Sequence, residues 1–151
     1  MLASFFRNLF TSKASRNQKE LDFAQSLVQL LKFQSAHETL DALLRRSPQN
    51  ASALMLRGAV KRLLNDPRGA LNDLEAALAL ELQADQAGCH FEIALCWRVL
   101  GDNARALESC QLARELDPCS VPAFFLLAQL RLPGDDYFDV LTRIIGHLKP
   151  R

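Results

Sequence analysis

The chain has 151 residues, of which 49% are apolar and 23% charged, and its formal net charge is +1. Such a chain is long enough to form one domain with a sizeable core, and its composition is that of an ordinary globular protein. The nearly balanced charge gives no reason to expect nucleic acid or a strongly acidic partner. No apolar run approaches the roughly 20 residues that a transmembrane helix requires.

The first predicted element is a short, basic, amphipathic helix within residues 1–16. No acidic residue precedes Glu20, and large apolar residues recur at spacings of three and four, which places them on one helical face: Leu2, Phe5, Phe6, Leu9 and Phe10. Three alternatives stay open, namely a helix that covers an apolar surface of this chain or a partner, a frayed tail, and a membrane-surface or targeting helix. The segment lacks the cleavage site of a secretory signal, so we expect a cytoplasmic protein.

After this segment, helical stretches follow one another in pairs. Three stretches share the order of a turn followed by an amphipathic helix that contains alanines: 30–48, 64–82 and 100–118. The stretch 132–150 is a looser version without alanine, and all of the four but 64–82 end in proline. Each follows another helical segment. Pro48 and Pro118 close helices, whereas Asp66 and Pro67 open one as cap and first helical residue. The sequence therefore predicts eight array helices, a short N-terminal helix and no strands.

The pairs form a repeat whose units begin near residues 17, 51, 87 and 121, separated by 34, 36 and 34 residues. Small residues recur at the eighth and twentieth places of the units, where helices are expected to cross closely: Ala24, Gly58, Ala94 and Ala128; Ala36, Ala70 and Ala106. We expect large residues to fill the gaps between them: Phe23, Leu27, Leu40, Leu54, Leu74, Ile93, Trp97, Phe124 and Leu127.

A helix–turn–helix unit with a period of about 34 residues resembles the tetratricopeptide-repeat family, here over about residues 17–149. The resemblance implies an all-α, right-handed superhelical array of about four antiparallel helix pairs, with residues 1–16 as a separate segment and a degenerate fourth unit. Arg57 and Lys61 depart from the family pattern, because their places in a unit are usually apolar. Such departures put the local packing of the second unit in doubt.

Catalytic and metal-binding motifs are absent from the sequence. The three histidines, His37, His90 and His147, fall in different units, and no catalytic triad or phosphate-binding glycine loop occurs. We therefore expect no enzymatic activity, no cofactor and no metal. The four cysteines form no C-x-x-C pair: Cys89, Cys96, Cys110 and Cys119. A metal site at Cys89, His90 and Cys96 is less favoured than small buried thiols in a reducing compartment.

The family resemblance also implies a binding groove, because the first helix of each unit lines the concave side of such arrays. Carried over to this sequence, the predicted partner-binding residues are Leu21, Gln25, Val28, Met55, Ala59, Arg62, Leu63, Phe91, Leu95, Arg98, Phe125 and Gln129. Met55, Phe91 and Phe125 would anchor a ligand, and Arg62 and Arg98 would pair with its carboxylates. Family members that clamp C-terminal Glu-Glu-Val-Asp peptides carry Lys and Asn where this chain has Leu21 and Gln25, so such a clamp is not expected.

These features predict a non-catalytic protein–protein interaction module that binds a peptide or helix of a partner protein in the groove. Two alternatives stay open. One is a secretion-type chaperone for an apolar client segment. The other is an N-terminal accessory or oligomerisation domain of a methyltransferase-type enzyme. The last stretch, 135–151, reads as an amphipathic helix followed by LKPR and resembles the lead-in to class I S-adenosylmethionine-dependent methyltransferases. The oligomeric state also stays open, a homodimer included, and a membrane contact is conceivable only for the N-terminal helix.

Overall fold

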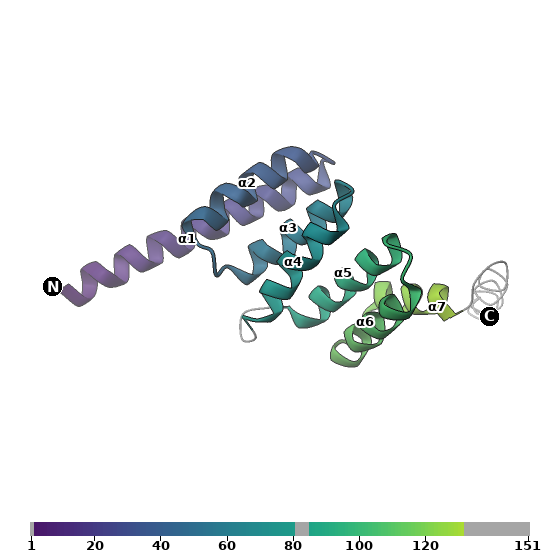
Figure 1. The fold of residues 1–151 in the computed structure, drawn as a ribbon. Helices are drawn as coiled ribbons and strands as arrows, with labels where there is room; N and C mark the ends of the chain where they lie inside the picture. The colour runs from purple at the N-terminus through teal and green to yellow at the C-terminus, as the bar shows by residue number, and fades with distance from the viewer. Residues whose placement is uncertain (1, 81–84, 132–151) are drawn as a thin grey trace, which may run out of the picture.

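The computed structural model describes residues 2–80 and 85–131, and the side chains from residue 13 onward. These ranges contain seven helices and no strand (Figure 1): α1 (Leu2–Gln29), α2 (Phe33–Arg46), α3 (Ala51–Leu63), α4 (Pro67–Leu78), α5 (Gln86–Val99), α6 (Asn103–Leu116) and α7 (Val121–Arg131). The predicted all-α array of helix pairs is confirmed. The last predicted helix and the methyltransferase-like end of the chain lie outside the described residues.

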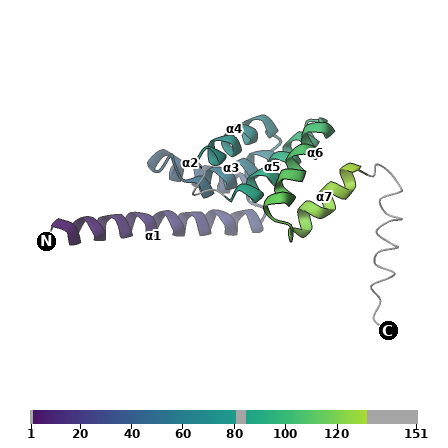
Figure 2. The same ribbon diagram turned by 90° about the horizontal axis from the view of Figure 1, so that it is seen from below.

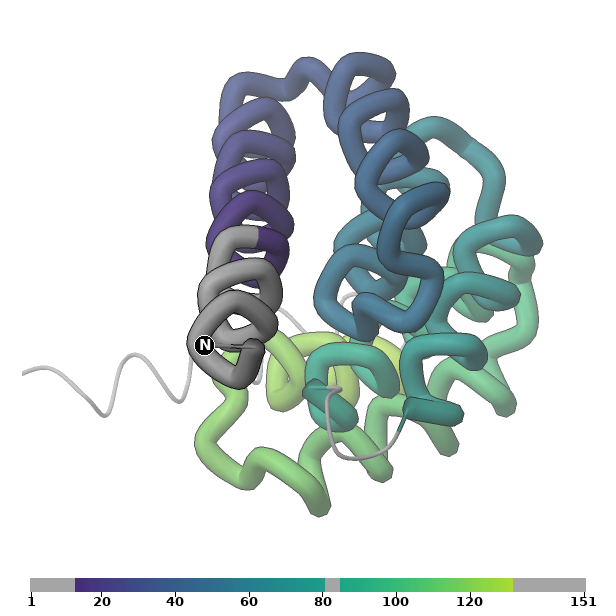
Figure 3. Tube along the Cα trace, turned by 90° about the vertical axis from the view of Figure 1, so that its left-hand side faces the viewer, coloured from purple at the N-terminus to yellow at the C-terminus, as the bar shows by residue number. Residues whose placement is uncertain are grey.

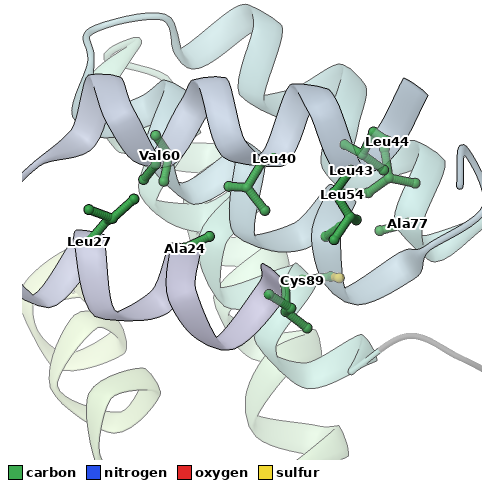
Figure 4. Packing of buried hydrophobic residues seen from close by; sticks show 12 residues of the cluster. Ala24, Leu27, Leu40, Leu43, Leu44, Leu54, Val60, Ala77 and Cys89 are labelled. Atoms are coloured by element: carbon green, nitrogen blue, oxygen red, sulfur yellow. The ribbon is translucent and has the colours of Figure 1, made fainter. Parts of the chain in front are cut away.

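The helices pack as a chain of neighbours. Each unit pairs its two helices, α1 with α2, α3 with α4 and α5 with α6, and the second helix of each unit packs against the first helix of the next. The core of the first units gathers leucines and alanines from four helices around Leu40, which is fully buried (Figure 4). Two smaller buried clusters continue this core toward α7. Stability is therefore distributed along the array, as in other repeat architectures.

The prediction of a separate short N-terminal helix is wrong, because residues 2–29 form one continuous helix, α1. The segment contains no glycine or proline, so nothing in its sequence ends a helix before Gln29. Its N-terminal half runs on beyond the array, with no other helix beside it (Figure 2). The structure therefore does not lay this segment against the other helices of its own chain.

Most of the predicted core residues are buried, but two phenylalanines are not. The small residues at the helix crossings of the first three units, Ala24, Gly58 and Ala94 among them, are buried, and Ala128 is half-buried. Phe23 is 58% exposed and Phe124 is 46% exposed, so their prediction as core residues was wrong. Phe23 belongs to α1, the first described helix, and Phe124 belongs to α7, the last described helix. Both lie where the stack of described units ends.

The turns between the two helices of a unit all have the same backbone conformation. The central residue of each has a positive φ: Leu31 (58°), Asn65 (66°) and Gly101 (81°). In all three turns, the N–H of this residue donates to the carbonyl three residues earlier and the next N–H donates to the carbonyl five residues earlier, at 2.8–3.1 Å. This is the Schellman cap, whose left-handed position favours glycine or asparagine. In the second and third units, Asp66 and Asp102 follow it and cap the next helix.

An ion network explains the two cations at usually apolar places. Arg57 donates to both carboxylate oxygens of Asp73, at 2.7 and 2.8 Å, and to Asp41 at 2.6 Å. Lys61 Nζ lies 2.9 Å from Asp73, whose side chain is almost fully buried. The hydrogen bond to Asp73 raises the pKa of Arg57 above its ordinary value. The cations of α3 thus pack between the acids of α2 and α4, where the family pattern has apolar contacts.

Candidate partner-binding face

The first helices of the units lie side by side along one face of the array. The helix α3 contacts both α1 and α5, and Arg98 of α5 donates a 3.0 Å hydrogen bond to Gln129 of α7. We call the surface that α1, α3, α5 and α7 share the inner face. Its residues are the twelve predicted partner-binding residues, which come from these four helices.

Burial separates these residues into three groups. Leu21 is only 5% exposed and belongs to the core, so its side chain is not accessible to a ligand. Several others are half-buried, since they pack against the core clusters or neighbouring helices: Val28, Met55, Ala59, Arg62, Phe91 and Leu95. The exposed members are Gln25, Leu63, Arg98, Phe125 and Gln129. The accessible part of the inner face therefore lies mainly toward its α5–α7 end.

The two arginines of the inner face differ in their partners. Arg62 Nε donates to Glu92 Oε2 at 2.9 Å, and both side chains are mostly buried, so this cation is already neutralised within the chain. Arg98 donates a hydrogen bond to the neutral amide of Gln129, and no acid of the described residues forms an ion pair with it. Sequence reasoning missed Glu92, because the family pattern places it off the groove. Only the packing of α3 against α5 brings the two charges together.

A pocket of about 610 Å³ lies away from the inner face, at the opposite edge of the first unit. It is lined by α1 near Lys13 and Asn17 and by the loop that joins α2 to α3. Asn17 Nδ2 donates to Ser47 Oγ at 2.9 Å, and Arg46 pairs with Glu20, so several of the polar groups there already have partners. None of the predicted partner-binding residues lines this pocket.

Comparison with known families decides which class of repeat this is. The sequence model of the tetratricopeptide repeat matches residues 21–60 and 64–120. The chain belongs to the tetratricopeptide-repeat family. No curated protein sequence matches it significantly. Among the described helices of this tetratricopeptide-repeat array, none is both long and apolar enough to cross a bilayer.

Solved tetratricopeptide-repeat structures share the fold. The first such domain of Spaghetti (RPAP3), bound to an HSP90 peptide, is 15% identical with a TM-score of 0.70, covering 78% of this chain and 91% of its own. The type III secretion translocator chaperone SycD of Yersinia enterocolitica is 18% identical with a TM-score of 0.69, covering 78% and 92%. MamA of Desulfovibrio magneticus RS-1 is 20% identical with a TM-score of 0.70, covering 89% and 78%. At these identities the likeness shows the fold alone.

The cysteines of the tetratricopeptide-repeat array differ sharply in burial. Cys89, Cys96 and Cys110 are buried, and Cys119 is exposed. Burial raises the pKa of Cys89 to about 11 and that of Cys96 to about 12. Burial also lowers the pKa of His90. Within the described part of the chain, no three His, Cys, Asp or Glu side chains gather closely enough to hold a metal ion.

We expect one of the four thiols to react with Ellman's reagent in the native protein. Cys119 is exposed, whereas the other three are shielded and, because their pKa values are raised, remain protonated at pH 8. Absorbance at 412 nm should therefore show one rapid equivalent, and three more after denaturant is added. The rapid equivalent should vanish in Cys119→Ser. Rapid reaction of more than one thiol in the folded protein would contradict the described packing.

Proposed function

We propose that this tetratricopeptide-repeat array is a non-catalytic interaction module that binds a peptide or helix of a partner protein on its inner face. The observation that carries the proposal is Arg98, a full cation whose described partner is neutral. It bonds to Gln129, one helical turn after Phe125, which is 39% exposed. The accessible part of the inner face thus offers an apolar anchor beside a cation that a carboxylate can engage.

The chemistry of this place favours a ligand with an apolar side chain followed or preceded by a carboxylate. Such a carboxylate can replace the Gln129 amide and accept two parallel hydrogen bonds from the Arg98 guanidinium. Aromatic residues and arginine are enriched among the residues that dominate binding energies. Arg62 is not part of this contact, because Glu92 already holds it.

Two similar arrays support the proposal, since one is described with an HSP90 peptide and SycD with a peptide of the translocator YopD. Their identities to this chain are 15% and 17%, so their ligands are not transferred to it. Leu21 is buried and Gln25 is neutral, so neither of these two places in the first unit offers a cation to a C-terminal carboxylate. The proposal includes a cytoplasmic location, because a reducing compartment suits the free thiols.

Affinity capture with a double variant tests the proposal. The wild type and Arg98→Glu/Phe125→Ala are compared by quantitative mass spectrometry of the captured proteins. We expect the amount of each captured partner protein to fall about tenfold or more in the variant, because the Phe125 anchor is lost and the charge at Arg98 is reversed. A matched charge reversal on the second helix of a unit, Arg114→Glu, which is exposed on α6, should leave capture unchanged. Circular dichroism must show equal melting curves. Equal capture by all three proteins would refute binding at the inner face.

A further inference from the structure

The first turn of the array differs from the other two at two positions, the left-handed residue and the residue that follows it. In the left-handed position, the second and third turns carry Asn65 and Gly101, and the first carries Leu31. At the next position, Asp66 and Asp102 accept a hydrogen bond from the helix they cap, whereas Lys32 makes no side-chain cap. The backbone hydrogen bonds of the three turns are otherwise the same.

Neither Leu31 nor Lys32 serves the stability of the fold. A left-handed conformation is destabilising for leucine, because its Cβ approaches the following carbonyl oxygen. The Leu31 side chain recovers nothing by packing, since it is 74% exposed. Lysine at a helix N-terminus offers no acceptor for the free N–H groups and repels the positive end of the helix dipole. Strained residues of this kind are typical of functional sites.

Leu31 also lies in a row of exposed apolar residues. The three turns follow one another along one edge of the array (Figures 1 and 3). Each contributes a pair of exposed large apolar residues: Leu30 and Leu31, Leu63 and Leu64, and Val99 and Leu100. We call these six residues the turn row. Exposed apolar residues that line one edge of a folded protein are typical of an interaction site.

A pocket of about 490 Å³ adjoins the turn row beside Leu100. Leu71 and Trp97 contribute apolar walls, and Arg68 and Arg105 lie at its rim. Arg105 stacks on Trp97, with its guanidinium carbon 4.5 Å from the ring centroid. The pocket offers room for one large apolar side chain of a ligand, next to cationic groups.

The charges along this edge favour an acidic ligand. The carboxylates of Asp66 and Asp102 accept backbone hydrogen bonds at the N-termini of α4 and α6. The positive ends of these helix dipoles compensate the negative charges of the two carboxylates. Arg105 lies 3.4 Å from Asp102, and Glu75 lines the same pocket. The exposed cations Lys32 and Arg68 take part in no ion pair with the described acids, so they remain for a partner.

We propose that the turn row is a second docking surface, which takes an acidic amphipathic helix of a partner protein. The apolar stripe of that helix covers the leucine and valine pairs, one large side chain enters the pocket beside Leu100, and flanking carboxylates meet Lys32 and Arg68. This surface shares Leu63 with the inner face but does not depend on Arg98 or Phe125. Leu31 belongs to the turn row alone and Lys32 follows it in the first turn, whereas Arg98 and Phe125 belong to the inner face alone. Variants of each pair therefore test the two proposals separately.

The test replaces Leu31 and Lys32 by the residues of the second turn, in the variant Leu31→Asn/Lys32→Asp. The probe is a fluorescein-labelled synthetic 18-residue helix with leucines at heptad spacing and glutamates elsewhere, and binding is measured by fluorescence anisotropy. We expect the melting temperature of the variant to rise by roughly 2–4 °C or more, because strain is removed and a helix cap added. We expect its affinity for the probe to fall about tenfold. Higher stability with weaker binding is a combination that damage to the fold does not produce.

Two controls make the result specific. Leu116→Asn, an equally drastic change of an exposed leucine at the end of α6 and the opposite edge of the array, should leave the affinity unchanged. A probe with lysine in place of glutamate should bind at least tenfold more weakly to the wild type. Equal affinity of wild type and the double variant would overturn the proposal. A second result would also overturn it. In that case the wild type self-associates or binds phosphatidylglycerol vesicles, and the double variant loses this property but binds the glutamate probe as well as the wild type does.

Discussion

Replacing Asp73 by alanine is expected to lower the free energy of unfolding by about 3–5 kcal/mol, the range for breaking a buried ion pair by removing one partner. The carboxylate of Asp73 is only 6% exposed and is shared by Arg57 and Lys61. Its removal leaves Lys61 without an acid at ion-pair distance among the described residues and Arg57 with Asp41 alone. Because α3 sits between α2 and α4 in this network, the loss should weaken the packing of the first two units.

Urea unfolding followed by circular dichroism measures this effect. The matched control is Glu75→Ala, which removes an exposed acid from the same helix and should change the stability by no more than about 0.5 kcal/mol. Adding Arg57→Met and Lys61→Met to the Asp73→Ala variant should recover much of the loss, since no unpaired cation then remains buried. If Asp73→Ala matched the control, the network would not contribute to the stability of the array.

Replacing Gly58 by valine is expected to cost about 3 kcal/mol, at the upper end of the range for overpacked cores. A Cβ at this position would lie 2.8 Å from Leu74 Cγ and 3.2 Å from the Ala70 carbonyl oxygen. Leu74 is fully buried and cannot move away without displacing its own neighbours. The helices α3 and α4 would therefore have to separate and would lose contact along their length.

Thermal unfolding compares Gly58→Val with Ala76→Val, which introduces the same branched side chain on the exposed side of α4. The control should cost only about 0.5 kcal/mol, the helix-propensity difference between alanine and valine. An intact near-ultraviolet spectrum, which reports on Trp97, would show that the third unit keeps its packing in the Gly58 variant. Equal stability of the two variants would contradict close crossing of α3 and α4 at Gly58.

The candidate sites were predictable to different extents. The helices that form the inner face follow from the repeat period, but Arg62 and Arg98 occupy equivalent places in their units and the sequence treats them alike. Their difference arises from Glu92 and Gln129, which are 30 and 31 residues away along the chain. The pocket beside Leu100 likewise combines residues from α4, α5 and α6. No local sequence pattern indicates such contacts between side chains of different helices.

The sequence by itself determined the helix pairs, their period and the small residues at their crossings, because these depend on helical periodicity and on caps formed by residues close together in the chain. Only the tertiary structure decided that Arg57 and Lys61 share Asp73, and that Phe23 stays exposed. The pairing and exposure of those side chains depend on which neighbouring unit covers them. In a stacked array that neighbour is set by contacts between helices tens of residues apart.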